Sequence, residues 1–142
     1  MIKFHILDYP EGKQPILPKR ATKGSAGYDI YSPENYLLKA GETIKLDSYI
    51  ACEMDEDMAL ILYTRSSLAL KGIVIVAGCN VIDSDYYNNP QNGGNIGLML
   101  KNTSNEDYQI CQGERLVQGV IVNYYVTDDD KCTKERVGGY GS

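Results

Sequence analysis

The sequence predicts a single all-β domain, built as a sandwich, a jelly roll or a barrel. Short β-rich apolar runs recur along the chain, and segments rich in Gly, Asn or Pro separate them, which is the pattern of many short strands joined by tight turns. The length of 142 residues suits one domain with its own core and is too short for two ordinary domains. The hydrophobic fraction of 43% is that of a folded globular protein.

Five of these runs are expected to form strands, at residues 43–46, 59–63, 73–76, 96–100 and 116–125. The turns between them include residues 39–42, 88–94 and 103–107. Residues 66–71 are expected to form one short helix, with Ser66 as a plausible N-cap and Gly72 as its end. Three glycines within the last five residues predict a flexible C-terminal tail.

The net charge and the absence of targeting signals limit the kinds of molecule that the protein is expected to bind. A net charge of −5 argues against a protein that holds a nucleic-acid polymer by its phosphates, since such domains carry a basic surface. A small anionic ligand remains compatible with this charge, because a few basic groups can act locally. The N-terminus lacks the features of a signal peptide, and no apolar run approaches the ~20 residues of a membrane span. We therefore expect a cytoplasmic protein without a membrane partner.

The cysteines do not suggest a metal centre. They stand at positions 52, 79, 111 and 132, far apart and without a C-x-x-C pair, and the chain has a single histidine. Zinc sites are usually built from closely spaced Cys and His residues, so no such site is expected. We expect reduced thiols packed in or near the core of a cytosolic protein.

Two segments in the first half of the chain place polar groups where ligands could bind. Residues 26–30 form a small-residue turn that leads into a strand carrying Asp29, although a surface aspartate would give the same pattern. Arg65, Ser66 and Ser67 stand where a strand meets the expected helix. Free N–H groups and the helix dipole favour anions at such a point, so the segment suits a phosphate. A simple serine cap beside a surface arginine is the alternative.

A third segment, residues 81–86, combines carboxylates with an aromatic ring. Strand alternation sends Asp83 and Asp85 to one side and Tyr86 to the other. The two acids are compatible with a hairpin surface, and a carboxylate at a strand end is also compatible with holding a water for in-line attack on phosphorus. Because the single histidine, His5, lies near the N-terminus, a carboxylate is the leading candidate for a general base.

The last two segments lie near the C-terminus. Residues 113–118 form a turn that enters a strong strand and place the amide of Gln118 among apolar residues, while Arg115 could simply pair with an acid. Residues 136–142 set Arg136 and Tyr140 on a glycine-rich tail. An arginine and an aromatic ring on such a tail suit a lid over a phosphorylated, planar ligand.

In this order the five segments resemble the five motifs of the trimeric dUTPase family, and they cover the chain from about Ala21 to Ser142. The resemblance implies a jelly-roll-like fold over residues 1–135 and a tail over residues 136–142 that closes on a neighbouring active site. It also implies a homotrimer that hydrolyses dUTP to dUMP and pyrophosphate with Mg²⁺. Each site at a subunit interface would combine three chains, which contribute the phosphate-binding residues, the hairpin and the tail respectively.

The same resemblance assigns roles around the phosphates. Asp83 is similar to the base that activates the water attacking the α-phosphorus, and Asp29 is similar to a residue that reaches Mg²⁺ through water. Phosphate contacts are implied for Ser66, Ser67 and Gln118, and Arg65 is expected to bind substrate in the same site. Mg²⁺ would be held mainly by the triphosphate oxygens and waters.

For the nucleoside and the tail, Tyr86 resembles the ring that packs on the sugar and excludes a 2′-hydroxyl. Arg136 resembles the γ-phosphate ligand, and Tyr140 stands where the family usually has a Phe stacked on uracil. Asn80 and Ser142 complete the expected substrate contacts. Asp85 is expected to be a solvated hairpin charge.

The chain departs from the family pattern at several positions. Asn80 replaces a common Gly and would have to adopt the left-handed conformation, which Asn tolerates. Ala77 replaces an Asn that helps to read uracil, so base recognition is expected to rest on backbone groups of the hairpin. A longer segment, residues 87–95, replaces a short link and is expected to be a surface loop without a chemical role. The tail stops at Ser142 where relatives continue, which predicts weaker final phosphate contacts.

Two other functions are compatible with this kind of sequence. A dCTP deaminase is similar in fold and shares an Arg-Ser-Ser segment, but that resemblance would imply a glutamate base and no tail with Arg136 and Tyr140. A non-catalytic relative that senses nucleotides or binds proteins is the other alternative, and the presence of Asp83 and Arg136 speaks against it.

Overall fold

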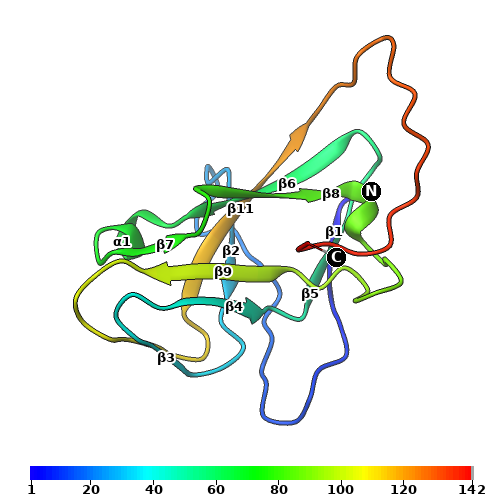
Figure 1. Cartoon of the computed structure of the whole chain (residues 1–142). Helices are drawn as coiled ribbons and strands as arrows, with labels where there is room; N and C mark the ends of the chain where they lie inside the picture. The colour runs from blue at the N-terminus through cyan, green and yellow to red at the C-terminus, as the bar shows by residue number, and fades with distance from the viewer. Residues whose placement is uncertain (142) are drawn as a thin grey trace.

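The computed structural model describes residues 1–141 and is built almost entirely of β-strands (Figure 1). The helices among these residues are the single α-helical turn α1 (Ser66–Ala69) and the 3₁₀ turn η1 (Ser84–Tyr86). The strands are β1 (Lys3–Ile6), β2 (Tyr28–Tyr31), β3 (Tyr36–Leu38), β4 (Thr43–Asp47), β5 (Ile50–Glu53), β6 (Met58–Thr64), β7 (Ile73–Ile75), β8 (Cys79–Asp83), β9 (Gly97–Asn102), β10 (Tyr108–Ile110) and β11 (Arg115–Asn123). The expectation of an all-β domain is confirmed.

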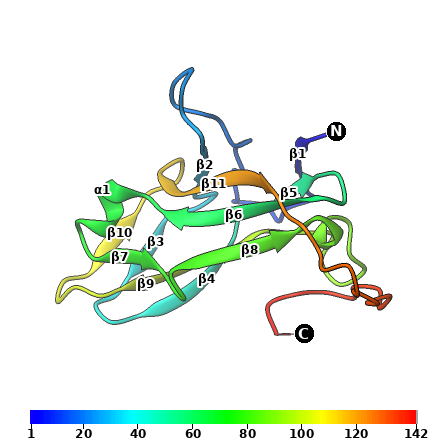
Figure 2. The ribbon, with the colours of Figure 1, turned by 90° about the horizontal axis from the view of Figure 1, so that it is seen from above.

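Two sheets pack face to face as a sandwich of jelly-roll type (Figure 2). One sheet has the strand order β2-β11-β6-β8, and the other has the order β4-β9-β7. Two short ladders, β1-β5 and β10-β3, complete the described strands. The strand pairings are antiparallel. Each pairing joins strands that are not consecutive in the chain, as in jelly rolls, whose neighbouring strands are joined by crossing connections.

The core forms where alternate residues of the two sheets point inward. Leu60 and Leu62 of β6 are buried and meet residues of the opposite sheet such as Leu98 and Leu100. Each fully buried side chain of this kind contributes about 1.5–3 kcal/mol relative to an exposed one. Gly119 lies beside the β6 leucines, and a Cβ there would approach Leu60 Cδ1 to 2.8 Å. Glycine at this position allows β11 to pack closely over the core.

The strand expectations were confirmed with small shifts of boundary, and the helix expectation was partly wrong. The helix α1 is shorter than expected, and its N-cap is Arg65 rather than Ser66, without a side-chain cap hydrogen bond. After Ala69 the chain tightens into a turn, where the Gly72 N–H donates to the Ala69 carbonyl at 3.0 Å.

The expected placement of the cysteines was correct for only one of them. Cys52 is buried, and the removal of its thiol from water raises its pKa to about 12. Cys79, Cys111 and Cys132 are exposed and free. Within residues 1–141, none of the helices has both the length and the apolar character that crossing a membrane would need.

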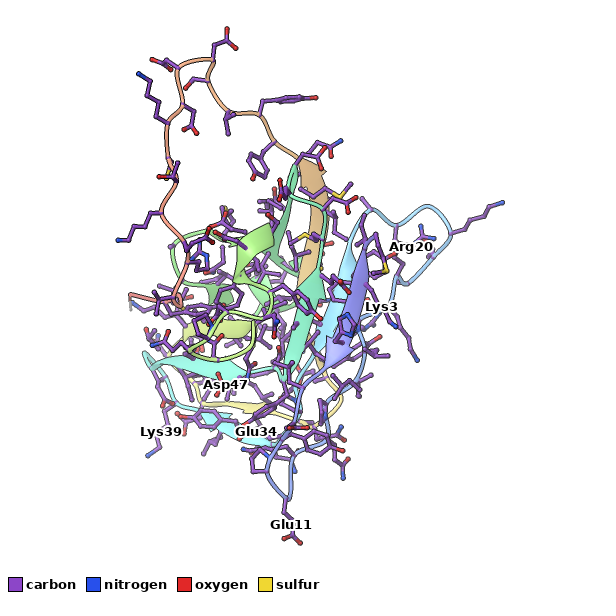
Figure 3. All side chains as sticks on the ribbon, turned by 90° about the vertical axis from the view of Figure 1, so that its right-hand side faces the viewer. Lys3, Glu11, Arg20, Glu34, Lys39 and Asp47 are labelled. Atoms are coloured by element: carbon purple, nitrogen blue, oxygen red, sulfur yellow. The ribbon has the colours of Figure 1, made fainter. Side chains whose placement is uncertain are left out.

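The segment after β11 leaves the body of the domain before it returns. Residues 124–135 are exposed and project away from the sandwich, and residues 136–141 then lie back over the chain near β8 (Figures 1 and 3). The flexibility expected of the tail stays a prediction. Ser142 lies outside the described residues.

Candidate active site

The central strand β11 brings three of the sequence segments together. Gln118 of β11 lies opposite Asp29 of β2 on one side and opposite Tyr63 of β6 on the other. A cavity of about 280 Å³ opens at this point and is called the β11 cavity below. It is lined by Ala21, Ser25, Ala26, Gly27, Asp29, Arg65, Ser66, Arg115 and Gln118.

The charges of the β11 cavity favour an anion. Asp29 is 8% exposed, and its oxygens lie 3.5 Å from Arg65 Nε and 3.6 Å from Arg115 Nη1. Arg65 also donates through Nη1 to the Arg115 carbonyl at 3.1 Å. Two guanidinium groups around one carboxylate leave an excess of one positive charge, and guanidinium groups match phosphate oxygens in geometry. A plain surface position for Asp29 is therefore wrong.

Glycine at position 27 allows the Gln118 amide to occupy its place in this cavity. A Cβ on Gly27 would lie 2.8 Å from Gln118 Oε1 and 3.3 Å from Gln118 Cβ. Contacts this short would displace the amide. Glycine at position 27 is therefore explained by steric contact with Gln118, which the sequence pattern alone did not reveal.

The second cavity has a volume of about 270 Å³ and lies along β8, in the segment that was expected to form a hairpin; it is called the hairpin cavity below. In the structure β7 pairs with β9 and β8 pairs with β6, so these two strands lie in different sheets. It is lined by Cys79, Asn80, Val81, Ile82, Asp83, Tyr86, Met99, Arg136, Gly139 and Tyr140. The connection from β7 to β8 turns at Ala77 and Gly78, with φ of 73° and 83°. The Gly78 N–H donates to the Ile75 carbonyl at 3.3 Å, so Ala77 is the second central residue of this turn, and positive φ at that position is typical of a type II turn. The left-handed positions are therefore these two residues, and the expectation that placed Asn80 there was wrong.

Asn80 contributes a buried hydrogen-bond donor without a partner. It lies in β8 opposite Leu62 and is 8% exposed. Among the side chains of residues 1–141, its Nδ2 is the buried polar atom that makes no hydrogen bond. A buried donor left unpaired costs about 1–3 kcal/mol, so a ligand carbonyl that reached this amide would remove that cost.

Two carboxylates at the end of β8 are held by the tail arginine. Arg136 donates through Nη2 to Asp83 Oδ2 at 2.7 Å and through Nε to Asp85 Oδ1 at 2.6 Å. The hydrogen bond to Asp85 is the main cause that raises the pKa of Arg136, and the negative charge of both acids adds to it. Asp85 is exposed, as expected of a solvated charge, and it also pairs with Arg136.

Two tyrosine rings meet where the tail covers the hairpin cavity. Tyr86 is 4% exposed, and Tyr140 packs edge-on against it with ring centroids 5.9 Å apart. The Tyr140 hydroxyl accepts from the Gly97 N–H at 2.8 Å and donates to the Gly97 carbonyl at 3.1 Å. Burial raises the pKa of Tyr140 to about 12. Gly139 is needed here, because a Cβ would lie 2.8 Å from Tyr86 Cε1.

Comparison with known proteins decides the family, because the family model described as dUTPase matches residues 13–141. The chain belongs to the dUTPase family. The deoxyuridine 5′-triphosphate nucleotidohydrolase of Lactococcus lactis subsp. lactis (strain IL1403) is 40% identical over 129 residues, which cover 89% of this chain and 86% of that protein. The enzyme of the same name from Nautilia profundicola is 32% identical over 136 residues, with 92% of each chain covered.

A solved structure supports the same assignment. The dUTPase from Streptococcus mutans superposes with a TM-score of 0.80 and 36% identity, covering 88% of this chain and 98% of that one. This confirms the jelly-roll-type fold and the resemblance to dUTPases. The enzyme is a dUTP diphosphatase, as the curated relatives are named.

The structure places the expected dUTPase residues in two groups. Asp29, Arg65, Ser66 and Gln118 line the β11 cavity, and Asn80, Asp83, Tyr86, Arg136 and Tyr140 line the hairpin cavity. Ser67 is exposed on α1 and is not among the residues that line either cavity. Their roles in binding or catalysis stay predictions.

Sequence reasoning missed some residues that complete these cavities. Arg115 was expected only as a possible partner of an acid, and it does pair with Asp29, but it also lines the β11 cavity. Its position at the start of the strand that carries Gln118 was the available signal. Met99 lines the hairpin cavity, and Gly97 bonds to the Tyr140 hydroxyl. Neither role was indicated by the sequence, because β9 has the pattern of an ordinary apolar strand.

Gly27→Ala is expected to lower kcat/KM for dUTP by about tenfold or more, because the new methyl group displaces the Gln118 amide and overpacking typically costs about 1–3 kcal/mol. Steady-state kinetics with pyrophosphate detection would measure this. Gly24→Ala is the matched control, since a Cβ there meets no atom within 4 Å. Equal kinetics for the two variants would show that the Gln118 amide is not used.

Proposed function

We propose that the enzyme cleaves dUTP by in-line attack of a water on the α-phosphorus, with Asp83 as the general base. The observation that carries this proposal is the composition of the hairpin cavity. It combines the Asp83 carboxylate, the Tyr86 ring and the unpaired Asn80 amide around one space of about 270 Å³. These are the groups needed to take a proton, pack on a sugar and bind a base carbonyl.

In the proposed step Asp83 removes a proton from the attacking water. The water oxygen then forms a bond to the α-phosphorus while the bond from that phosphorus to the α–β bridging oxygen breaks. The bridging oxygen leaves with the electron pair as part of pyrophosphate, and dUMP remains. In the described structure Asp83 bonds to Arg136, so Arg136 would leave Asp83 when it binds the γ-phosphate.

The triphosphate is proposed to bind in the β11 cavity. Arg65, Ser66 and Gln118 line it, and Ser67 is added by the family resemblance. The excess positive charge around Asp29 supports an anionic ligand, and charge-assisted hydrogen bonds to phosphate are among the stronger polar contacts.

The donor groups of the β11 cavity are compatible with a bound Mg²⁺–triphosphate. Asp29 is the carboxylate that lines this cavity, and its oxygens are shared with two arginines, which suits contact through a water. Mg²⁺ retains several waters and is commonly bound by substrate phosphates with one or two carboxylates, where it neutralises charge on the triphosphate. The D95N variant of the phage phi11 dUTPase of S. aureus, which shares the fold, has a coordinated structural Mg(II) ion.

A homotrimer with shared sites is part of the same proposal. The two groups of residues line separate cavities of one chain, so a site that uses both would join different subunits. Residues 124–135 are exposed, with Tyr125 at 92% and Val126 at 66%. Apolar side chains on a projecting segment favour contact with another subunit. The tail, which here lies on its own hairpin, would then reach a neighbouring site.

The direct test is an assay of the purified protein against dUTP, dCTP, dTTP and UTP in which pyrophosphate and ammonia are both monitored. Pyrophosphate from dUTP alone is the expected result. Ammonia from dCTP would identify a deaminase, and nucleotide binding without any product would identify a sensing relative. A cytoplasmic location and the absence of nucleic-acid and membrane partners also stay predictions.

Asp83→Asn is expected to reduce kcat by about 10²–10⁴-fold, because the amide keeps the shape but cannot take a proton. Binding of a non-hydrolysable imido analogue of dUTP, measured by calorimetry, should change little. Asp85→Asn is the matched control, since Asp85 bonds to the same arginine. If both variants lose activity equally, the loss of kcat comes from the contact that both carboxylates make with Arg136, and Asp83 is not the general base.

Deletion of residues 136–142 is expected to leave a folded oligomer with strongly reduced turnover. The tail would no longer exclude water from the phosphates or align them for in-line attack. Turnover and thermal unfolding should be measured side by side. Full activity would remove the tail from the mechanism, and a collapse of stability would make it a structural element.

A further inference from the structure

The loop of residues 87–95, called the asparagine loop below, encloses the Tyr86 side chain. It was expected to be a surface loop without a chemical role; Asn88, Pro90 and Gln91 are exposed, whereas Asn89 and Gly94 are buried. Asn89 is 5% exposed and its Nδ2 donates to the Tyr86 carbonyl at 2.7 Å. Gly94, with φ of +95°, would bring a Cβ to 2.9 Å from Tyr87 Cα, so the loop folds tightly against the end of η1.

The loop forms two hydrogen bonds with the Tyr86 hydroxyl. The hydroxyl donates to the Asn95 carbonyl at 2.6 Å and accepts from Asn92 Nδ2 at 2.8 Å. The single proton of the hydroxyl is therefore used by the loop, and burial raises its pKa. A tyrosine ring held at its far end in this way cannot tilt without breaking both bonds.

The asparagine side chains hold one another in place. Asn92 Oδ1 accepts from Asn89 Nδ2 at 2.7 Å and from the Gly94 N–H at 3.0 Å. Asn89 Oδ1 in turn accepts from the N–H groups of Gln91 and Asn92 at 3.0 and 3.1 Å. Because each amide uses both its donor and its acceptor side, the amide that reaches Tyr86 has a fixed orientation.

The loop is also fixed to the body of the domain and to the tail. Asn95 Oδ1 accepts from the Tyr49 N–H at 2.9 Å, and the Ile96 N–H donates to the Ile50 carbonyl at 2.9 Å. On its other side the Gln91 N–H donates to the Val137 carbonyl at 3.2 Å. The Tyr86 ring is thus held between a rigid loop and the tail residues Gly139 and Tyr140.

We propose that the asparagine loop is the element that enforces deoxyribose selectivity, because it fixes the Tyr86 ring through the hydroxyl. This inference rests on the proposed role of Tyr86 as the ring that packs on the sugar. Exclusion of a 2′-hydroxyl by a ring is a steric effect, and it fails if the ring can move aside. Asn92 is therefore a positioning residue for sugar specificity, although it need not touch the nucleotide.

The test compares dUTP with UTP in the wild-type enzyme and in Asn92→Ala. The ratio of kcat/KM for the two nucleotides is expected to fall about tenfold, which corresponds to ~1.4 kcal/mol of discrimination. The change should lie mainly in a lower KM for UTP. Calorimetric Kd values for the imido analogues of dUTP and UTP should shift in the same sense, so the result does not depend on turnover. Asn105→Ala, on the exposed 103–107 turn, is the matched control and should keep the wild-type ratio.

Tyr86→Phe provides a second route that leaves the loop sequence intact, and it covers the case in which Asn92→Ala fails to fold. It removes the hydroxyl that the loop holds, so a similar fall in selectivity is expected. In the Tyr86→Phe background, Asn92→Ala should lower the ratio by less than about twofold further, because the shared interaction is already absent.

The outcomes separate this inference from the proposed function. Tyr86→Ala should admit UTP if the ring is the sugar contact; if it does not, the proposed role of Tyr86 fails and the inference fails with it. If Tyr86→Ala admits UTP while Asn92→Ala and Tyr86→Phe keep the wild-type ratio, the loop inference alone is overturned. An undiminished effect of Asn92→Ala in the Tyr86→Phe background would also overturn it.

Discussion

The pairing of β11 with both β2 and β6 is the constraint on which the phosphate-binding half of the site depends. Gln118 lies opposite Asp29 in one ladder and Tyr63 in the other. Side chains alternate between the faces of a sheet, so a slip of one residue would turn Gln118 away from the cavity. The irregular register between Arg115 and Val117 gives the start of β11 its own direction, and Arg115 there faces Asp29. Strand register thus sets which charges meet.

The sequence predicted the all-β class and the long strands because their apolar runs are buried whatever the exact topology. It did not predict short strands such as β1 and β3. These strands have few residues and a mixed polar and apolar pattern, so they can be identified only from their pairing with β5 and β10. The N-cap of α1 was misplaced for a related reason, since the chain geometry at Arg65 depends on how β6 ends. Most of the residues that the family motifs selected line one of the two cavities, with Ser67 as the exception among the described residues. The unpaired amide of Asn80 is visible only in three dimensions.

The asparagine loop shows why polar composition is a poor guide to exposure. Residues 87–95 are rich in Asn and Gly and suggested a solvated turn. Each amide carries donors and an acceptor, so asparagines can satisfy one another and leave water outside. The result is a small polar core, with Asn89 buried and Asn92 directed at Tyr86. Such a core is specific because every hydrogen bond has a direction, whereas an apolar core of the same size would allow the ring to shift.

The contact of Arg136 with Asp83 and Asp85 would couple the binding of the triphosphate to the release of the catalytic carboxylate. In the described structure the two carboxylates accept hydrogen bonds from the Arg136 guanidinium, as the oxygens of an anionic ligand would. All three groups are partly exposed, so these ion pairs are individually weak, typically 0–1 kcal/mol. If Arg136 and Asp83 act as proposed, capture of a triphosphate by the arginine releases the carboxylate at the same moment. The substrate would then unmask the group that activates its own nucleophile, and an empty site would keep that group neutralised.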